Sequence, residues 1–142
     1  MAVTLRAARE ADAEHVASLM TELGYPSTAE GVKDRLRGSL SSQTSCCLVA
    51  EAENKVIGMM SVELIPYFPT GSTICRVTSL VVSSQHRSRG VGEKLMTAAA
   101  TFARKHGCAG IEVTSSERRV DAHRFYQRLG FARAGLRFFQ AL

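Results

Sequence analysis

Apolar side chains recur at two different spacings along the chain, and the spacing separates helices from strands. Residues 11–23 place apolar side chains at intervals of three and four, which predicts an amphipathic helix that ends at Gly24 and Pro26. A second, more polar helix is predicted to follow, with Ser27 as its N-cap and its end near residues 38–42. Two helices therefore precede most of the strands.

The clearest helical pattern covers residues 90–106. Basic residues at its end suit the negative pole of a helix dipole, and Gly107 terminates it. A shorter helix is predicted at 119–129, before Gly130. The inward faces are predicted to be Val91, Leu95, Ala99, Phe102 and Ala103 in the first helix, and Phe125 and Leu129 in the second.

Segments rich in β-branched residues predict strands between these helices. The turn-like triplet 53–55 separates two of them and predicts an antiparallel hairpin, whereas 66–72 is predicted to be a loop. The predicted strands cover 3–7, 46–52, 56–65, 73–83 and 110–114, with short strands around Phe131 and 136–139.

Length and composition indicate one soluble domain over residues 1–142, since 45% of the residues are apolar and 22% are charged. The net charge of +5 favours an anionic partner. Basic residues form no long run, and nine Phe and Tyr without Trp provide no stacking platform, which argues against nucleic acid. A phosphorylated small molecule fits the charge better.

Cysteine and histidine spacing indicates neither a metal site nor a disulfide framework. Cys46, Cys47, Cys75 and Cys108 lack a C-x-x-C pair, and the four histidines are scattered. Residues 1–19 carry several charges in place of an apolar signal region, and no apolar run reaches membrane-spanning length. We therefore expect a cytoplasmic protein with reduced thiols and no membrane partner.

The segment 85–92, between a predicted strand and the longest helix, has the residues of an anion site. A helix N-terminus presents unpaired amides, Gly90 and Gly92 permit close backbone approach, and Arg87 and Arg89 add positive charge. A G-x-G pair can also serve only as a tight turn. A Walker loop is excluded because G-K-[ST] is missing, and a dinucleotide fingerprint is excluded because no third glycine follows.

Two blocks of this sequence resemble the GNAT superfamily of acyl-CoA-dependent N-acyltransferases. Arg87, Gly90 and Gly92 match the [RQ]-x-x-G-x-[GA] motif after Leu80-Val81-Val82, and 122–131 looks like the A-x-x-F-Y-x-x-x-G-F block. The resemblance implies an α/β (α+β) GNAT-like fold. Its central sheet would be mixed and mostly antiparallel, with six to seven strands, four flanking helices and splayed parallel strands at the cofactor cleft.

The resemblance also implies acetyl-CoA as cosubstrate and no metal. The pantetheine arm would bind backbone groups around Leu80 and Val82, and the diphosphate would lie on the amides of 87–93. The cofactor-binding residues implied in this way are Leu80, Val81, Val82, Arg87, Ser88, Arg89, Gly90, Val91, Gly92 and Glu93.

Tyr126 occupies the position where the family usually keeps a general acid for the departing thiolate, although an aromatic residue there can also serve only to pack. The family's common base, a glutamate two residues before the Leu-Val-Val triplet, is replaced by Thr78. Glu63 is the alternative base, directly or through water. An acyl-cysteine relay through Cys75 or Cys108 is disfavoured because neither has a neighbouring His partner in the sequence.

The predicted function is transfer of an acetyl group from acetyl-CoA to a primary amine of a small molecule or peptide, by direct attack. The missing glutamate supports an alternative, a non-catalytic acyl-CoA sensor. A nucleic-acid binder would rest on net charge alone. The edge strands predicted near 136–142 could pair between subunits, which makes a homodimer one expected arrangement.

Overall fold

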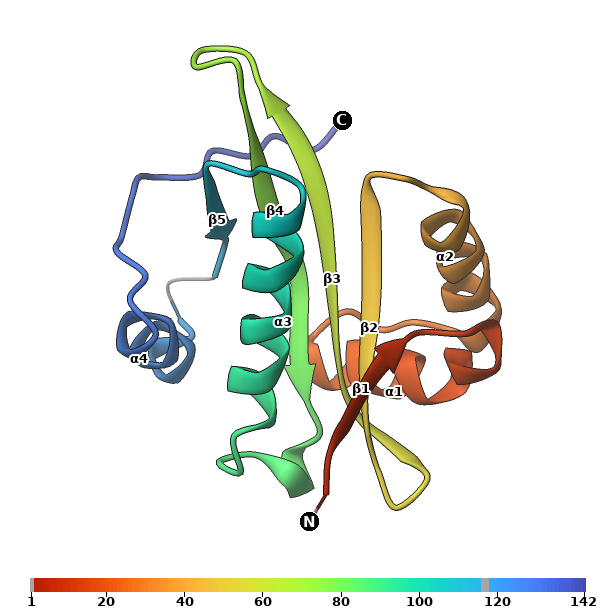
Figure 1. The fold of residues 1–142 in the computed structure, drawn as a ribbon. Helices are drawn as coiled ribbons and strands as arrows, with labels where there is room; N and C mark the ends of the chain where they lie inside the picture. Colours follow the sequence, from red (N-terminus) through yellow and green to blue (C-terminus); the bar gives the residue numbers. More distant parts are fainter. Residues whose placement is uncertain (1, 116–117) are drawn as a thin grey trace. The chain divides into compact units, whose positions relative to one another are not determined.

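The computed structural model describes residues 2–115 and 118–142 as two compact units, Met1–Glu112 and Val113–Leu142, and each unit is described by itself. Figure 1 shows the elements as ribbons. They are β1 (Thr4–Ala7), a 3-10 turn η1 (Glu10–Asp12), α1 (Ala13–Leu23), α2 (Ala29–Ser41), β2 (Ser45–Ala52), β3 (Lys55–Tyr67), β4 (Ser72–Val82), a 3-10 turn η2 (Ser84–His86), α3 (Val91–Lys105), β5 (Gly110–Val113) and α4 (Val120–Arg128).

The sheet has the strand order β1-β2-β3-β4-β5. Neighbours from β1 to β4 are antiparallel, whereas β5 runs in the same direction as β4 in Figure 1. The β5 end is attached where the Ala109 N–H donates to the Thr73 carbonyl over 2.9 Å. Helix α3 provides the crossover that two parallel strands require. The predicted mixed, mostly antiparallel α/β class with four helices is confirmed.

The β2–β3 hairpin closes as its turn residues predict. Glu53 and Asn54 both have positive φ, 51° and 61°, and Ala52 pairs with Lys55, which defines a two-residue turn with the twist of a hairpin. The predicted loop at 66–72 is shorter in the structure, because Pro66 lies within β3. Proline is tolerated there because the last β2–β3 hydrogen bond joins Leu64 to Thr44, and β3 continues beyond it as an edge.

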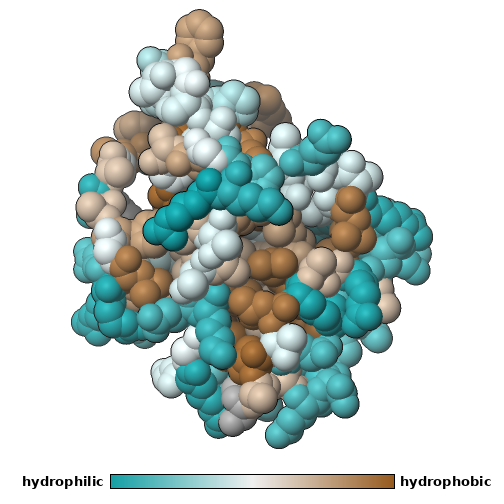
Figure 2. Space-filling model, viewed as in Figure 1, coloured by the Kyte–Doolittle hydropathy of each residue, from teal (hydrophilic) through white to brown (hydrophobic). Residues whose placement is uncertain are grey.

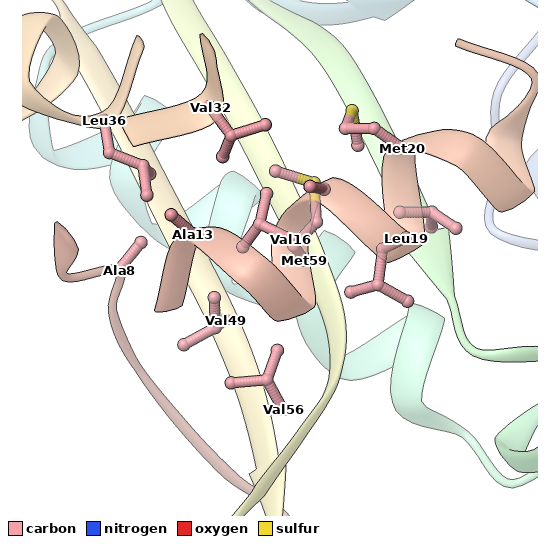
Figure 3. Packing of buried hydrophobic residues seen from close by; sticks show 12 residues of the cluster. Ala8, Ala13, Val16, Leu19, Met20, Val32, Leu36, Val49, Val56 and Met59 are labelled. Atoms are coloured by element: carbon pink, nitrogen blue, oxygen red, sulfur yellow. The ribbon is translucent and has the colours of Figure 1, made fainter. Parts of the chain in front are cut away.

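One core lies between the sheet and the helix pair α1–α2. Figure 3 shows side chains from both helices meeting Val49, Val56 and Met59 of the sheet. The N-cap of α2 is Thr28, whose side chain accepts from the Gly31 N–H over 3.1 Å; the predicted cap, Ser27, is wrong by one residue. Buried members of this core include Val16, Leu19, Met20, Val32 and Leu36.

Helix α3 covers the opposite face of the sheet. Its buried residues are Val91, Leu95, Met96, Ala99 and Ala103. Phe102, predicted to point inward, is only half-buried, because it lies at the margin of the stripe and stacks on the His106 ring with centroids 4.3 Å apart. The rest of the predicted inward face is confirmed.

The unit Val113–Leu142 contains α4 and a C-terminal segment without regular secondary structure. The strands predicted around Phe131 and 136–139 are absent from the described residues, so the sheet has five strands in place of six to seven. The sequence pattern was β-prone, but a strand also requires a neighbour for its backbone hydrogen bonds. Leu136 and Phe138 are exposed accordingly, at 68% and 89%. The interpretation of 1–142 as a single domain stays a prediction.

Candidate active site

The end of β4 directs alternate backbone groups to opposite sides. Ser83 N–H donates to the Ile57 carbonyl over 2.8 Å, and the register pairs Gly58 with Val82 and Met59 with Val81. Because hydrogen-bonded pairs alternate in an antiparallel ladder, Val81 bonds to β3 whereas Leu80 and Val82 turn their amide and carbonyl groups away from it. Val81 also buries its side chain in the core, with 5% exposed.

Strand β5 does not extend along this part of β4. It has four residues and begins beside Thr73, so it ends before Leu80 and Val82. Within the part of the chain that the structure describes, no strand pairs with β4 at these two residues, so they present a short backbone edge of the kind that binds an extended amide-containing ligand. The Val82 carbonyl already accepts from Arg87 Nε over 3.2 Å, which orients the guanidinium group and leaves its terminal nitrogens for a ligand.

The first turn of α3 adjoins this edge. Gly90 is the N-cap and has φ 79°, which favours glycine, and the first α3 hydrogen bond runs from Lys94 N–H to the Gly90 carbonyl. The amides of Val91, Gly92 and Glu93 thus precede the helical ladder. Ser88 also has a positive φ, 62°, so the loop reverses sharply before the helix.

Gly58 lets this helix end approach the sheet. A Cβ on Gly58 would lie 3.2 Å from the Val81 carbonyl oxygen and 3.4 Å from the Val91 side chain. A shallow groove runs from Gly90 along the flank of α3 to Val3 and Leu5, and Figure 2 shows apolar atoms gathered between α3 and β1. The amide end of α3 therefore packs closely against the sheet while remaining open to the surface.

A polar cluster lies on the α1–α2 face of β3 and β4, where β4 contains a β-bulge. The register passes from Ser61↔Ser79 to Val62↔Val77, which leaves Thr78 as the extra residue. The Ser61 hydroxyl lies 2.7 Å from that of Thr78 and also bonds to that of Ser79. The position of the missing glutamate therefore carries a hydroxyl cluster.

Glu63, further along β3, is held by the Ser45 hydroxyl, which donates to its carboxylate. Its cross-strand neighbour Arg76 forms its ion pair with Glu112 instead. Among the described residues, no basic side chain forms an ion pair with Glu63. Glu63 is half-buried.

Tyr126 lies in the second unit, on the last turn of α4. Its ring packs edge-on against Phe125 and Phe131, with centroids 5.2 and 5.7 Å away. Phe131 N–H donates to the Tyr126 carbonyl and Gly130 N–H to the Gln127 carbonyl, which is a Schellman cap. Burial raises the pKa of the Tyr126 phenol and the charge of Arg119 opposes this shift, so the phenol is protonated at neutral pH.

Comparison with known proteins decides the family. The model for the acetyltransferase (GNAT) family matches residues 11–131. The chain belongs to the GNAT acetyltransferase family. The match contains both blocks on which the sequence resemblance depends, and that resemblance is confirmed.

Relatives agree at the level of sequence and of fold. Human N-acetyltransferase 8 is 30% identical over 108 residues, which are 76% of this chain and 48% of the relative. The chain thus spans about half the length of the first curated relatives it matches. Aminoalkylphosphonate N-acetyltransferase from Salmonella typhimurium is 29% identical, over 87% of this chain and 78% of that protein.

Solved structures confirm the GNAT fold. A structure called a transcriptional regulator from Bacillus halodurans superimposes with a TM-score of 0.85 and 25% identity, covering 98% of this chain and all of the other. Aminoglycoside N-acetyltransferase AAC(6′)-Iy, solved with CoA, has a TM-score of 0.88 at 19% identity, covering 99% and 95%. The second likeness shows the fold alone.

The structure of this GNAT chain brings together most of the predicted site residues. Those from Leu80 to Glu93 lie on β4, η2 and the first turn of α3, and Glu63 lies on the strand beside them. Sequence reasoning named Thr78 but missed its cluster with Ser61 and Ser79. It also missed Glu22, whose carboxylate accepts from Ser84 N–H over 3.1 Å. Nothing in the sequence marks a contact between residues so far apart along the chain.

Cys47 and Cys75 are unsuited to nucleophilic catalysis. Burial raises the pKa of the Cys75 thiol to about 11 and that of Cys47 to about 12, so neither is a thiolate at neutral pH.

Within the described parts of the chain, no cluster of three His, Cys, Asp or Glu side chains could hold a metal ion. No helix of those parts is long and apolar enough to cross a membrane.

Proposed function

We propose that this GNAT chain transfers the acetyl group of acetyl-CoA to a primary amine of a small molecule or peptide. The observation that carries the proposal is the backbone edge of Leu80 and Val82, which leads directly into the amide end of α3 beside Arg87. An extended ligand with amide groups that ends in a diphosphate fits this arrangement, because the β4 edge can bind its amides and the α3 amides can bind its diphosphate.

Each predicted cofactor residue has a distinct part in this proposal. Leu80 and Val82 offer backbone hydrogen bonds to the pantetheine amides, whereas Val81 supports them by packing. The amides of Val91, Gly92 and Glu93 and the charge of Arg87 bind the diphosphate. Ser88 and Gly90 shape the loop through their positive φ, and Arg89 adds positive charge beside it.

Acetyl-CoA, when bound, supplies a thioester carbonyl that a neutral amine can attack. Glu63 accepts a proton from the incoming ammonium group, directly or through water, so that the nitrogen lone pair is free. As the new C–N bond forms and the C–S bond breaks, Tyr126 gives its phenolic proton to the sulfur. The nitrogen releases to solvent the proton that it no longer holds as an amide, and Tyr126 regains a proton from solvent. The hydroxyls of Ser61 and Thr78, 2.7 Å apart, are neutral hydrogen-bonding groups at the position where the family usually has a glutamate.

The names of related proteins suggest which acceptor amines to test first. One is named an aminoalkylphosphonate N-acetyltransferase, and structural neighbours are named glucosamine-6-phosphate and aminoglycoside N-acetyltransferases. All three names denote acylation of a small-molecule amine. Among the described residues Glu63 has a hydrogen bond from Ser45 but no ion pair with a basic side chain, which supports a cationic acceptor of this kind.

The deciding experiment has two stages. Isothermal titration with CoA is expected to give one site per chain, and acetyl-CoA with a panel of these amines, polyamines, amino acids and peptides is expected to release free thiol. No CoA binding would overturn the proposal. Tight CoA binding with a silent panel would favour the sensor, which the hydroxyl cluster at the usual glutamate position also supports.

A further inference from the structure

We propose that Glu22, at the end of α1, is a positioning residue for the loop between β4 and α3, to which the proposed function assigns the CoA diphosphate. The inference rests on the proposed function, because it concerns the same loop. Glu22 lies in the last turn of α1, and its Oε1 accepts a hydrogen bond from the Ser84 backbone N–H at 3.1 Å. The contact joins residues 62 positions apart.

The Ser84 amide is the place where an external anchor has most effect. The last sheet bond of β4 is made by Ser83 to Ile57, and the next local bond joins His86 N–H to the Ser83 carbonyl. Ser84 is the first residue of the η2 turn between them, and its amide points out of the turn toward α1. Glu22 thus holds the chain at the point where it leaves the sheet and enters the loop.

The loop beyond this anchor turns through left-handed backbone. Ser88 and Gly90 both have positive φ, so the path from η2 to α3 turns sharply within a few residues. A small rotation at Ser84 would shift Arg87 relative to the edge of β4 and to the α3 amides, whose residue Val91 is packed against the sheet. Holding Ser84 therefore pre-organises the diphosphate site, which lowers the conformational cost of binding.

Electrostatics alone would disfavour an acid at this place. A carboxylate beside a site for a diphosphate repels the ligand, and removing it should strengthen binding at low salt. If Glu22 instead positions the loop, a variant that loses the hydrogen-bond acceptor should bind CoA more weakly. The sign of the change in CoA affinity therefore distinguishes a positioning residue from a bystander.

The test compares Glu22→Ala with Glu22→Gln by titration with CoA. Glu22→Ala removes the acceptor and is expected to weaken CoA binding about fivefold to tenfold, the order expected for one exposed hydrogen bond. Glu22→Gln keeps an oxygen that can accept from Ser84 and is expected to bind within about twofold of the wild type. The melting temperature should change little in either variant, because the contact is exposed.

Glu14→Ala is the matched control for charge. Glu14 is also an exposed acid on α1, near its other end, and its substitution changes the net charge equally. It is expected to leave CoA affinity unchanged or slightly tighter.

Ser84→Pro tests the donor. Proline lacks the amide N–H but suits the first position of a helical turn, and Ser83 has the extended ψ of 138° that a residue before proline requires. Ser84→Pro should weaken CoA binding as Glu22→Ala does, and the two changes together should add nothing further.

Three outcomes would each overturn the positioning role. Glu22→Ala could bind CoA as tightly as the wild type or more tightly, or Glu22→Gln could weaken binding as much as Glu22→Ala does. The third is that the effects of Glu22→Ala and Ser84→Pro add in the double variant. Wild-type protein that binds no CoA would instead overturn the proposed function itself. The two failures are distinguishable because the second is seen before any substitution is made.

Discussion

At the scale of single residues, Tyr126 and Glu63 are assigned opposite proton transfers, so their variants should respond differently to pH. Tyr126→Phe removes the acid and is expected to lower kcat about 100-fold at every pH from 6 to 9, with CoA affinity unchanged. Glu63→Gln should lower kcat about tenfold at pH 7 and recover at higher pH, because the acceptor amine then loses its proton to solvent. Initial rates of thiol release with the best acceptor measure both. A Tyr126→Phe rate within about twofold of wild type would reduce Tyr126 to the packing partner of Phe125 and Phe131.

At the scale of elements, glycine has different effects after a helix and inside one. Gly107 follows α3 with φ 67°, and its N–H donates to the Arg104 carbonyl within a Schellman cap. Gly107→Ala is expected to destabilise the protein by about 1 kcal/mol, whereas Gly38→Ala should stabilise it by about 0.5 kcal/mol. Gly38 lies inside α2, and a Cβ there meets nothing within 4 Å, so the second variant is the matched control. Urea denaturation measures both changes, and equal signs would contradict the assignment of Gly107 as the cap.

At the scale of the whole molecule, one buried carboxylate ties the N-terminal strand to α1 and β2. Asp12 is 6% exposed and accepts from both terminal nitrogens of Arg6, at 2.8 and 2.9 Å, while Arg6 also pairs with Glu51 of β2. The Arg6 hydrogen bonds lower the pKa of Asp12 and outweigh the opposing effect of burial.

A carboxylate whose pKa is lower in the folded state stabilises the fold above its unfolded pKa of about 3.9 and loses this contribution as pH falls toward its folded value. The contribution of Asp12 to the free energy of unfolding should therefore be constant above about pH 5 and decline below it. Asp12→Asn is expected to cost about 3 kcal/mol at pH 7 and to flatten this decline. The exposed Asp34, 3.4 Å from Arg37, is the control, and Asp34→Asn should change stability by less than about 0.5 kcal/mol. Denaturant titrations at pH 3 to 7 measure both, and an undiminished acid slope in Asp12→Asn would contradict the assignment.

The local sequence by itself determined those helix ends and turns whose conformation depends only on a few neighbouring residues. The helix ends at Gly24, Gly107 and Gly130 are as predicted, because left-handed backbone depends on the residues at the turn. The predicted hairpin turn 53–55 is also found, closed by Glu53 and Asn54, with Lys55 already in β3. The strand, basic glycine loop and helix from Leu80 to Gly92 were likewise readable, since both donors and spacing lie in one stretch.

Tertiary structure decided whatever requires a partner from another part of the chain. The β-prone segment 131–142 is not a strand, because strand formation depends on a neighbour and not on propensity alone. The bulge at Thr78, the preference of Arg76 for Glu112 over Glu63 and the grip of Glu22 on Ser84 arise from sheet register and helix packing. Such contacts join distant residues, so their geometry exists only once the sheet has formed.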